Sequence, residues 1–444
     1  MKQDLYAEYF YGKKVTVMGL GLLGRGVGDT EFLSENSAEI IVTDIKQEVD
    51  LAPSLKTLAP FSGITYHLGS HNLTDFEKKD FILKAAGVPY DSPYIAHAKA
   101  LNIPIVMSAA FVAQIITKAN LGVTIIGVTG TRGKSTVTQL VAHILASSGL
   151  RVFLGGNIRG MANLPLLKAL EEGDYLVLEL DSWQLQGFGD LKISPHIAVF
   201  TSFMDDHMNY YKNNKELYFN DKAHIYRHQK EYDVLIASPQ ATEEIRARDA
   251  DTMITIPEGI FFEMNLIGEH NQVAARLAYE VASQCGLSEE EIKNAIKMFS
   301  GVEGRLQNLG LLGKEKSIRV FNDNNATTGD ATIAAIDAIN ETYNKKPILI
   351  IGGTDKGLSL DSLEQTILVG VKTCVFLNGT GTSRLNLPKE YEFETLAECV
   401  EKAFELAQDG DIILFSPSFA SFGKYFNNEY ERNDEFMKEV QKFC

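Results

Sequence analysis

Short apolar runs recur along the chain, and most of them end in a glycine-rich or polar loop that leads into a segment with helical spacing. Apolar runs of about four to eight residues bounded in this way are typical of strands buried in a parallel sheet. Their alternation with helical segments predicts an α/β fold. The expected strands are 13–18, 39–43, 81–84, 103–106, 121–128, 152–154, 175–182, 196–200, 317–321, 346–351, 374–377 and 412–415.

The expected strands fall into three groups along the chain. With 444 residues, the chain is long enough for about two to four domains. Gly301 and Gly304 precede the third group and bracket a predicted hinge. We therefore predict a Rossmann-like N-terminal domain over residues 1–110, a central domain with a mostly parallel sheet over 111–300, and a Rossmann-like C-terminal domain over 301–444.

The composition is that of an ordinary soluble globular protein, with 45% hydrophobic and 23% charged residues. The net charge of −16 disfavours nonspecific binding to nucleic acid or to an anionic membrane surface. The four cysteines show no metal-binding spacing, which suits a reducing compartment. The N-terminus has no signal-peptide pattern, and no apolar run reaches the roughly 18 residues of a spanning helix. We therefore expect a cytoplasmic monomer without membrane insertion.

The segment 121–149 combines an apolar strand, a glycine-containing loop and an amphipathic helix. Two glycines let the loop turn sharply, and the helix N-terminus that follows attracts phosphate. Lys134 would neutralise phosphate charge, and Ser135 or Thr136 would offer a hydroxyl to Mg²⁺. The usual P-loop has glycine where Val128 stands, so an ordinary turn between strand and helix is the alternative. The candidate phosphate-binding residues are Gly130, Thr131, Arg132, Gly133, Lys134, Ser135 and Thr136.

A second glycine loop, Gly19-Leu20-Gly21-Leu22-Leu23-Gly24, follows the first expected strand, and Asp44 follows the second. This pattern has the form of the dinucleotide fingerprint, and taken alone it suggests an NAD-dependent oxidoreductase. The physical properties of such a loop, a tight turn and a helix N-terminus, suit a diphosphate of any kind. Asp44 is either a helix cap or solvated loop carboxylate, or a ligand of a ribose or base.

Two polar side chains are placed at the ends of strands in the central group. Glu179 lies near the end of an apolar run, and His207 follows the next expected strand beside Asp206. Ligands of open α/β sheets bind at this edge. A carboxylate there suits Mg²⁺. The position of the histidine at the same edge favours a functional role for it. Lys222, by contrast, has the spacing of a solvated helix lysine, and Asn271 either caps a helix or contacts a base.

Three polar loops follow strands of the third group, at 322–329, 352–357 and 416–424. Loops of this kind either cap helices or bind ligands. Because the carboxyl ends of parallel strands meet at one edge of a sheet, the three loops together favour a binding site.

In chain order, these motifs resemble those of the Mur ligase family, the cytoplasmic ATP-dependent amide-bond ligases of peptidoglycan synthesis. The glycine loop at 19–24 and the loops at 353–357 and 416–421 are most similar to those of the members that join D-glutamate to UDP-N-acetylmuramoyl-L-alanine. The resemblance extends over the entire chain. The matching motifs are 127–136, 156–158, 178–180, 206–208, 268–271, 304–305, 322–323, 353–357 and 416–417.

The resemblance implies an ATP-dependent acid–amino-acid ligase that works through an acyl phosphate, with ATP, two Mg²⁺ ions, UDP-MurNAc-L-alanine and glutamate as cofactors and substrates. It implies a catalytic set of Lys134, Glu179, His207 and a carbamylated Lys222, and a metal site of Ser135, Thr136, Glu179, His207 and Lys222. ATP would also meet Asn271, Arg305 and Asp323. The UDP substrate would meet Gly19, Gly21, Leu22, Leu23, Gly24, Asp44, Gly87, Asn157 and His207. The amino acid would meet Asn325, Thr327, Ser421, Phe422 and Lys424.

The chain departs from the family pattern at several of these positions. Arg132 replaces the usual asparagine of the phosphate loop, and ATP, the glutamate or Asp181 is its expected partner. Asn325 replaces a lysine that contacts the carboxylate of the amino acid. Either Lys424 or Arg132 compensates, or the added amino acid differs, with L-glutamate as the alternative to D-glutamate. A noncatalytic homologue that binds nucleotide also stays open.

Overall fold

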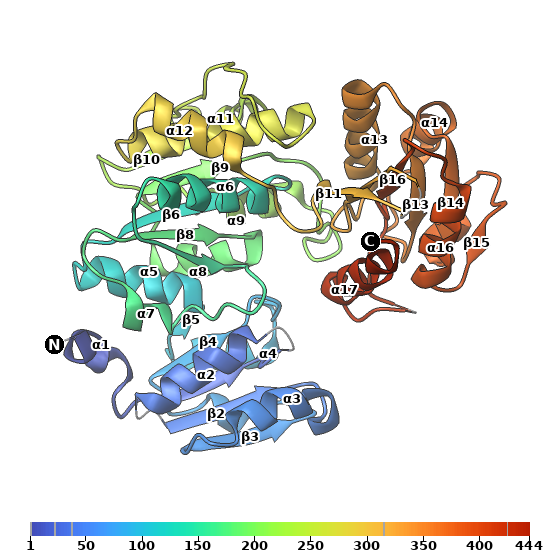
Figure 1. Ribbon diagram of the computed structural model, residues 1–444. Coiled ribbons are helices and arrows are strands. Elements are labelled where there is room, and N and C mark those ends of the chain that lie inside the picture. The colour runs from blue at the N-terminus through green and yellow to red at the C-terminus, as the bar shows by residue number, and fades with distance from the viewer. Residues whose placement is uncertain (1, 22–23, 37–38, 314–315, 424) are drawn as a thin grey trace. The chain divides into compact units, whose positions relative to one another are not determined.

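The computed structural model describes residues 2–444 except 22–23, 37–38, 314–315 and 424. The described residues form three sheets (Figure 1). The chain divides into two compact units. The first comprises Met1–Gly259 and Arg276–Ile292, and the second comprises Ile260–Ala275 and Lys293–Cys444.

The N-terminal sheet of the first unit has the strand order β3-β2-β1-β4-β5, with every pair parallel. Alternate side chains of β1 enter different cores: Val17 packs with Phe32 of α2, whereas Met18 packs with Ile95 of α4. Helices therefore cover both faces of this sheet. The elements are α1 (Lys2–Phe10), β1 (Lys14–Met18), α2 (Arg25–Glu35), β2 (Glu39–Asp44), α3 (Glu48–Leu58), β3 (Ile64–Leu68), η1 (Leu73–Phe76), β4 (Phe81–Lys84), α4 (Pro93–Ala100) and β5 (Ile105–Val106).

The central sheet, also in the first unit, is entirely parallel with the order β10-β9-β6-β8-β7. The chain builds this sheet to one side of β6 and then to the other, which makes the end of β6 a topological switch point, where α/β proteins bind ligands. The elements are α5 (Ser108–Lys118), β6 (Thr124–Thr129), α6 (Lys134–Ser147), β7 (Val152–Gly156), α7 (Leu166–Ala169), β8 (Tyr175–Glu179), α8 (Ser182–Leu191), β9 (Ile197–Phe200), α9 (Lys215–Ala223), β10 (Val234–Ala237) and α10 (Pro239–Arg246). Two helices, α11 (Glu269–Gln284) and α12 (Glu289–Met298), contribute to both units.

The sheet of the second unit has the order β11-β12-β16-β13-β14-β15, in which only the β11–β12 pair is antiparallel. Leu349 and Ile351 of β13 pack with α13 and α14, whereas Ile348 and Ile350 pack with α16 and α17. The elements are β11 (Gln307–Leu312), β12 (Ile318–Asn322), α13 (Gly329–Tyr343), β13 (Ile348–Gly352), α14 (Asp361–Gly370), β14 (Thr373–Leu377), α15 (Thr380–Arg384), β15 (Glu392–Phe393), α16 (Leu396–Leu406), β16 (Ile412–Phe415), α17 (Glu429–Val440) and η2 (Gln441–Phe443).

The predicted α/β fold with three sheets is confirmed, and every strand expected from the sequence is present within a few residues. Strands β3, β10, β11 and β15 were not predicted. The expected boundary between residues 110 and 111 falls inside α5, so the limits of the three domains stay a prediction.

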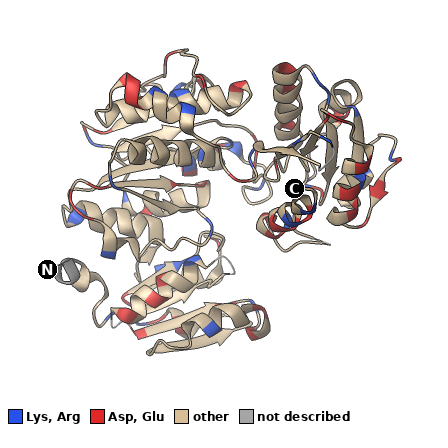
Figure 2. Cartoon of the chain, viewed as in Figure 1, with Lys and Arg blue, Asp and Glu red and all other residues tan. Residues whose placement is uncertain are grey.

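Charged side chains of both signs are interspersed over the helices of each unit, as Figure 2 shows. Within the described ranges, no helix combines the length and the apolar character that a membrane span requires.

Candidate active site

The phosphate loop between β6 and α6 has a backbone that requires glycine at two positions. Gly130 has a φ of 147°, and a Cβ atom on it would lie 2.0 Å from the Thr201 hydroxyl oxygen. Gly133 has a φ of 84° and forms the N-cap of α6. The first turn of α6, whose N–H groups have no partner within the helix, therefore follows the loop directly. This is the arrangement that binds phosphate.

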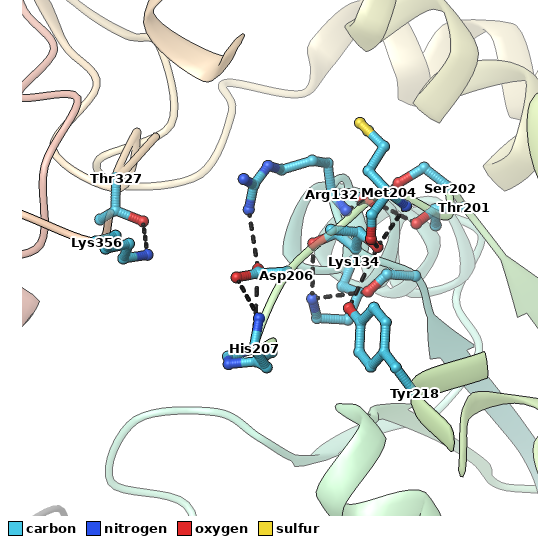
Figure 3. A network of polar contacts seen from close by, with 12 residues as sticks. Arg132, Lys134, Thr201, Ser202, Met204, Asp206, His207, Tyr218, Thr327 and Lys356 are labelled. Atoms are coloured by element: carbon cyan, nitrogen blue, oxygen red, sulfur yellow. Dashed lines mark hydrogen bonds and ion pairs between the residues drawn. The ribbon is translucent and has the colours of Figure 1, made fainter. Parts of the chain in front are cut away.

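The loop is fastened to the segment that follows β9 (Figure 3). The Thr131 N–H donates to the Ser202 carbonyl oxygen at 2.7 Å, and the Arg132 N–H donates to Ser202 Oγ at 2.8 Å. The hydroxyls of Thr201 and Ser202 both donate to the Arg132 carbonyl oxygen. The Thr131 hydroxyl donates to the Met204 carbonyl oxygen at 3.1 Å. These bonds hold the loop backbone in its binding conformation, so binding a phosphate costs little ordering.

Two lysine side chains converge on the carbonyl oxygen of Gly130. Lys134 Nζ donates to it at 3.0 Å, and Lys222 Nζ donates to it at 2.8 Å. Lys222 is only 1% exposed, so its interpretation as a solvated helix lysine was wrong. Burial lowers the pKa of Lys222 well below its usual value, and the charge of Lys134 lowers it further. The Lys222 amine is therefore more easily deprotonated than a surface lysine.

Arg132 has Asp206 as a partner, at 3.3 Å between Nη1 and Oδ2 (Figure 3). Asp181, one of its three expected partners, instead caps α8 by accepting the Gln184 N–H at 2.7 Å. Asp206 also accepts the N–H of His207 at 2.9 Å. The Arg132 side chain thus connects the phosphate loop to the backbone that carries His207.

The His207 ring lies against Trp183, with 4.8 Å between the ring centroids. Burial is the largest of the effects that lower the pKa of His207, and it outweighs the opposing influence of Asp206. The neutral imidazole, which can accept a proton or coordinate a metal through a ring nitrogen, is therefore favoured.

The other predicted metal ligands lie at the same sheet edge as the phosphate loop. Glu179 ends β8 and pairs with Val128 near the end of β6, while Ser135 and Thr136 belong to the first turn of α6. Within the described part of the chain, no three His, Cys, Asp or Glu side chains gather into a metal-binding group. A single carboxylate with nearby hydroxyls still fits Mg²⁺, which commonly keeps waters and substrate phosphates as its remaining ligands.

Asn157 is brought to this edge by the turn at the end of β7. Gly156 has a φ of 83°, and a Cβ atom there would lie 2.1 Å from the Glu179 carbonyl oxygen. The Asn157 N–H donates to that same oxygen at 2.7 Å. Asn157 and Glu179 are therefore neighbours, although they come from different strands.

The glycine turn after β1 is braced by Asp44. This buried carboxylate accepts the N–H groups of Leu20 at 2.9 Å and of Gly21 at 3.3 Å. The expectation of a helix cap or a solvated carboxylate is therefore wrong, and a contact with ribose or base stays a prediction. Among the other residues predicted for the UDP substrate, Gly19 and Gly24 lie in the described part of this turn, Gly87 is exposed after β4, and Leu22 and Leu23 lie outside the described residues.

The three residues predicted to contact the nucleotide in the second unit are Asn271, Arg305 and Asp323. Asp323 accepts the Leu306 N–H at 3.0 Å and the Ser416 hydroxyl at 2.9 Å, and burial raises its pKa to about 7. The Arg305 charge opposes that rise. Asn271 is buried, and its Nδ2 donates to the Ile267 carbonyl oxygen at 2.8 Å.

A lysine missed by the sequence reasoning lies in the predicted amino-acid site of the second unit. Lys356 Nζ donates to the Thr327 hydroxyl at 3.0 Å (Figure 3). Lys356 therefore places a positive charge next to the loop in which Asn325 occupies the position of the family's lysine. Its motif, 353–357, was recognised, but the two loops follow different strands, so only the folded sheet brings them together.

Ser421 lines a cavity of about 300 Å³ at the carboxyl ends of β13, β14 and β16, together with Thr354, Ser383 and Arg432. The buried Arg432 guanidinium donates to both oxygens of Asn324 and to the Phe419 carbonyl. Of the other predicted amino-acid ligands, Phe422 is 56% exposed and Lys424 lies outside the described residues.

Two protein-family models match the chain: the Mur ligase middle domain over residues 128–256 and the Mur ligase MurD-like N-terminal domain over residues 13–107. The chain is 32% identical to a UDP-N-acetylmuramoylalanine--D-glutamate ligase from Borreliella afzelii (strain PKo), with 96% of each chain covered. A protein of the same name from Streptococcus pyogenes serotype M1 is 33% identical, again over 96% of each. The crystal structure of MurF ligase from Thermotoga maritima in complex with ADP has a TM-score of 0.61 and 14% identity, covering 99% of this chain and 96% of that one. At 14% identity, this last likeness shows the fold alone.

Proposed function

This chain belongs to the Mur ligase family, and from that premise we propose that it joins D-glutamate to UDP-N-acetylmuramoyl-L-alanine. Membership makes it an ATP-dependent acid–amino-acid ligase of peptidoglycan precursor synthesis. The choice of substrates follows the names of the relatives that match it over 96% of its length. We take its partners to be small molecules and its location to be the cytoplasm, and we take it to act as a monomer.

The observation that carries the proposal is the convergence of Lys134 and Lys222 on the phosphate loop, at the sheet edge that also carries Glu179. A phosphate loop alone suits many ATP-using enzymes. Phosphate binding by the backbone N–H groups of the loop does not require a second, buried lysine beneath that loop. The combination therefore favours a ligase site over an ordinary ATP hydrolase.

The proposed reaction has two steps. The carboxylate of the muramoyl substrate attacks the γ-phosphorus of ATP, which forms an acyl phosphate and releases ADP. The amine of glutamate then attacks the acyl carbon, and phosphate leaves from the tetrahedral intermediate. Lys134 would balance the charge that develops on the transferred phosphoryl group. In the same geometry, the N–H groups of the loop would stay hydrogen-bonded to the phosphates of the nucleotide that are not transferred.

Ser135, Thr136, Glu179 and His207 are the residues that would hold two Mg²⁺ ions, with a carbamylated Lys222 as a further ligand. Mg²⁺ would neutralise phosphate charge and orient the phosphate oxygens. An ammonium cannot serve as a ligand, but a carbamate supplies anionic oxygens, which Mg²⁺ prefers. The lowered pKa of Lys222 supports this assignment, because only the neutral amine reacts with CO₂.

The first test is a panel of D- and L-amino acids with ATP and UDP-MurNAc-L-alanine, read by the mass of the product. We expect D-glutamate to give the product and ADP release to require the muramoyl nucleotide and glutamate together. If L-glutamate is the preferred amino acid, the assignment of D-glutamate as the substrate is wrong. ADP release that does not depend on the muramoyl nucleotide would exclude the proposed function.

Replacement of Lys356 tests the amino-acid site. We expect Lys356→Met to raise KM for glutamate about 10- to 100-fold, because a hydrogen bond to a charged group contributes roughly 1.5–3 kcal/mol. KM for ATP should stay within about twofold. Lys389→Met, which removes another lysine from the same unit, is the matched control for loss of a charge. An equal rise in KM for both substrates would assign Lys356 to the stability of the unit rather than to glutamate.

A further inference from the structure

Helix α2 of the N-terminal sheet packs closely against the segment 156–164, which carries Asn157. Gly28 faces Ala162 so tightly that a Cβ atom on Gly28 would lie 2.6 Å from the Ala162 Cβ. Gly24, one turn earlier, lies opposite Gly160, and a Cβ atom on Gly24 would lie 3.8 Å from the Gly160 Cα. Small residues at these positions bring the helix backbone against the segment.

Asp29, on the same face of α2, holds the far end of this segment. Its Oδ1 accepts the N–H of Asn163 at 3.0 Å and the N–H of Leu164 at 2.8 Å. The Asn163 side chain in turn accepts the Gly156 N–H at 2.7 Å. Because Asp29 is only 4% exposed, water does not compete for these bonds. Both ends of the segment are therefore fixed through one carboxylate.

Arg25, in the first turn of α2, acts on the Asn157 side chain itself. Its Nη1 donates to Asn157 Oδ1. A guanidinium has donors and no acceptor, so only the amide oxygen of Asn157 can face it. The Nδ2 donors of Asn157 then point to the other side. The backbone of the segment is held by other contacts, those of Asp29 and Glu179, and the Arg25 charge also favours the ionised form of Asp29 by lowering its pKa.

We propose that Arg25 and Asp29 are positioning residues for the muramoyl substrate: Asp29 fixes the segment 156–164, and Arg25 fixes the rotation of the Asn157 amide. The assignment rests on the proposed function, in which Asn157 meets that substrate. It adds a chemical requirement, namely that the substrate group facing Asn157 is a hydrogen-bond acceptor, because Asn157 presents N–H donors to it. Helix α2 thereby links the glycine turn at its N-terminus to a second part of the substrate site.

A double-mutant cycle on Arg25 and Asn157 tests the role of Arg25. We expect Arg25→Met to raise KM for UDP-MurNAc-L-alanine about tenfold, with kcat and KM for ATP changed less than about twofold. Arg25→Lys, which keeps a cationic donor, should restore part of the loss. In the Asn157→Ala background, Arg25→Met should have no further effect, since Arg25 acts through the amide. A full tenfold effect in that background would overturn the proposal and make Arg25 a direct substrate ligand.

Asp29 is tested with a pair of variants of similar size. Asp29→Asn keeps an oxygen that accepts both N–H groups and should leave KM for the muramoyl substrate within about threefold, whereas Asp29→Leu should raise it about tenfold or more. Glu35→Gln is the matched control, because it breaks the ion pair between Glu35 of α2 and Lys168 of α7 without touching the segment. Equal effects of Asp29→Asn and Asp29→Leu would overturn the role of Asp29.

A second measurement separates this inference from the proposed function. Hydrogen–deuterium exchange of the uncomplexed protein should show faster exchange at Gly156, Asn163 and Leu164 in Asp29→Leu than in wild type or Glu35→Gln. If the wild type makes no product from UDP-MurNAc-L-alanine, the proposed function fails, and exchange still reports on the segment. If the wild type is active and exchange is unchanged in Asp29→Leu, the positioning inference alone fails. Where Asp29→Leu does not fold, the Arg25 cycle decides.

Discussion

Replacement of Lys134 by methionine is expected to lower kcat about 10²–10³-fold, the cost of removing one preorganised group that stabilises transition-state charge. Lys134 Nζ lies 3.0 Å from the Gly130 carbonyl oxygen and 3.2 Å from that of Thr131, so it is held inside the loop. A cation held there stabilises the phosphoryl group most when charge develops during transfer. The loss should therefore appear mainly in kcat, with a smaller change in KM for ATP.

ADP release measured with saturating muramoyl substrate and glutamate gives both constants for Lys134→Met. Lys118→Met is the control, because Lys118 is exposed on α5 and its loss changes the net charge equally. The unfolding temperature of both variants should match that of the wild type. A variant with normal kcat and only a raised KM for ATP would contradict the assignment and leave Lys134 with a role in nucleotide binding alone.

Replacement of Lys222 by alanine is expected to reduce kcat by about 10²–10³-fold, because the proposed carbamate supplies charge to the metal site. Formate or another small carboxylate should restore part of the activity, since the variant leaves space where anionic oxygens can bind. The side chain is almost completely enclosed, with Tyr218 beneath its Nζ at 4.9 Å from the ring centroid.

The Lys134→Met variant provides the control for this rescue. Both variants remove a lysine that donates to the Gly130 carbonyl oxygen, but only Lys222 is assigned an anionic form. Formate should therefore leave Lys134→Met unchanged. Full activity of Lys222→Ala, or equal rescue of both variants, would refute the carbamate. The mass of the intact wild-type protein with and without added bicarbonate gives an independent reading.

The buried strands were predictable because parallel strands covered on both faces read as continuous apolar runs, as in 412–415. The four missed strands, β3, β10, β11 and β15, all lie at sheet edges. In β3, Ile-Thr-Tyr-His-Leu is only partly buried, and β15 has two residues. Strand β11 is an antiparallel edge strand with an irregular register, so it lacks the apolar run that marks its neighbours. Edge position does not by itself remove the signal, because the edge strands β5 and β7 were predicted and the missed edge strand β10, Val-Leu-Ile-Ala, is apolar and mostly buried.

The phosphate loop was predictable because its residues are contiguous in sequence and because its glycines mark the positions where the backbone turns sharply. The environment of Lys222 was not, since its acceptor at Gly130 lies 92 positions away. The pairing of Arg132 with Asp206 spans 74 positions, and that of Lys356 with Thr327 joins two loops. Spacing along one helix or strand carries no information about such partners, because the packing of several elements creates them.

The residues proposed for the amino acid and the phosphate loop belong to different compact units. Each unit has buried cores of its own, so a substitution in the loops after β12 and β13 leaves the packing around β6 intact. Natural selection can therefore change the acceptor of such a ligase without rebuilding its chemistry. The asparagine at 325 and the lysine at 356 on the neighbouring loop both lie in the second unit, so this departure from the family pattern leaves the first unit, with its phosphate loop, unchanged.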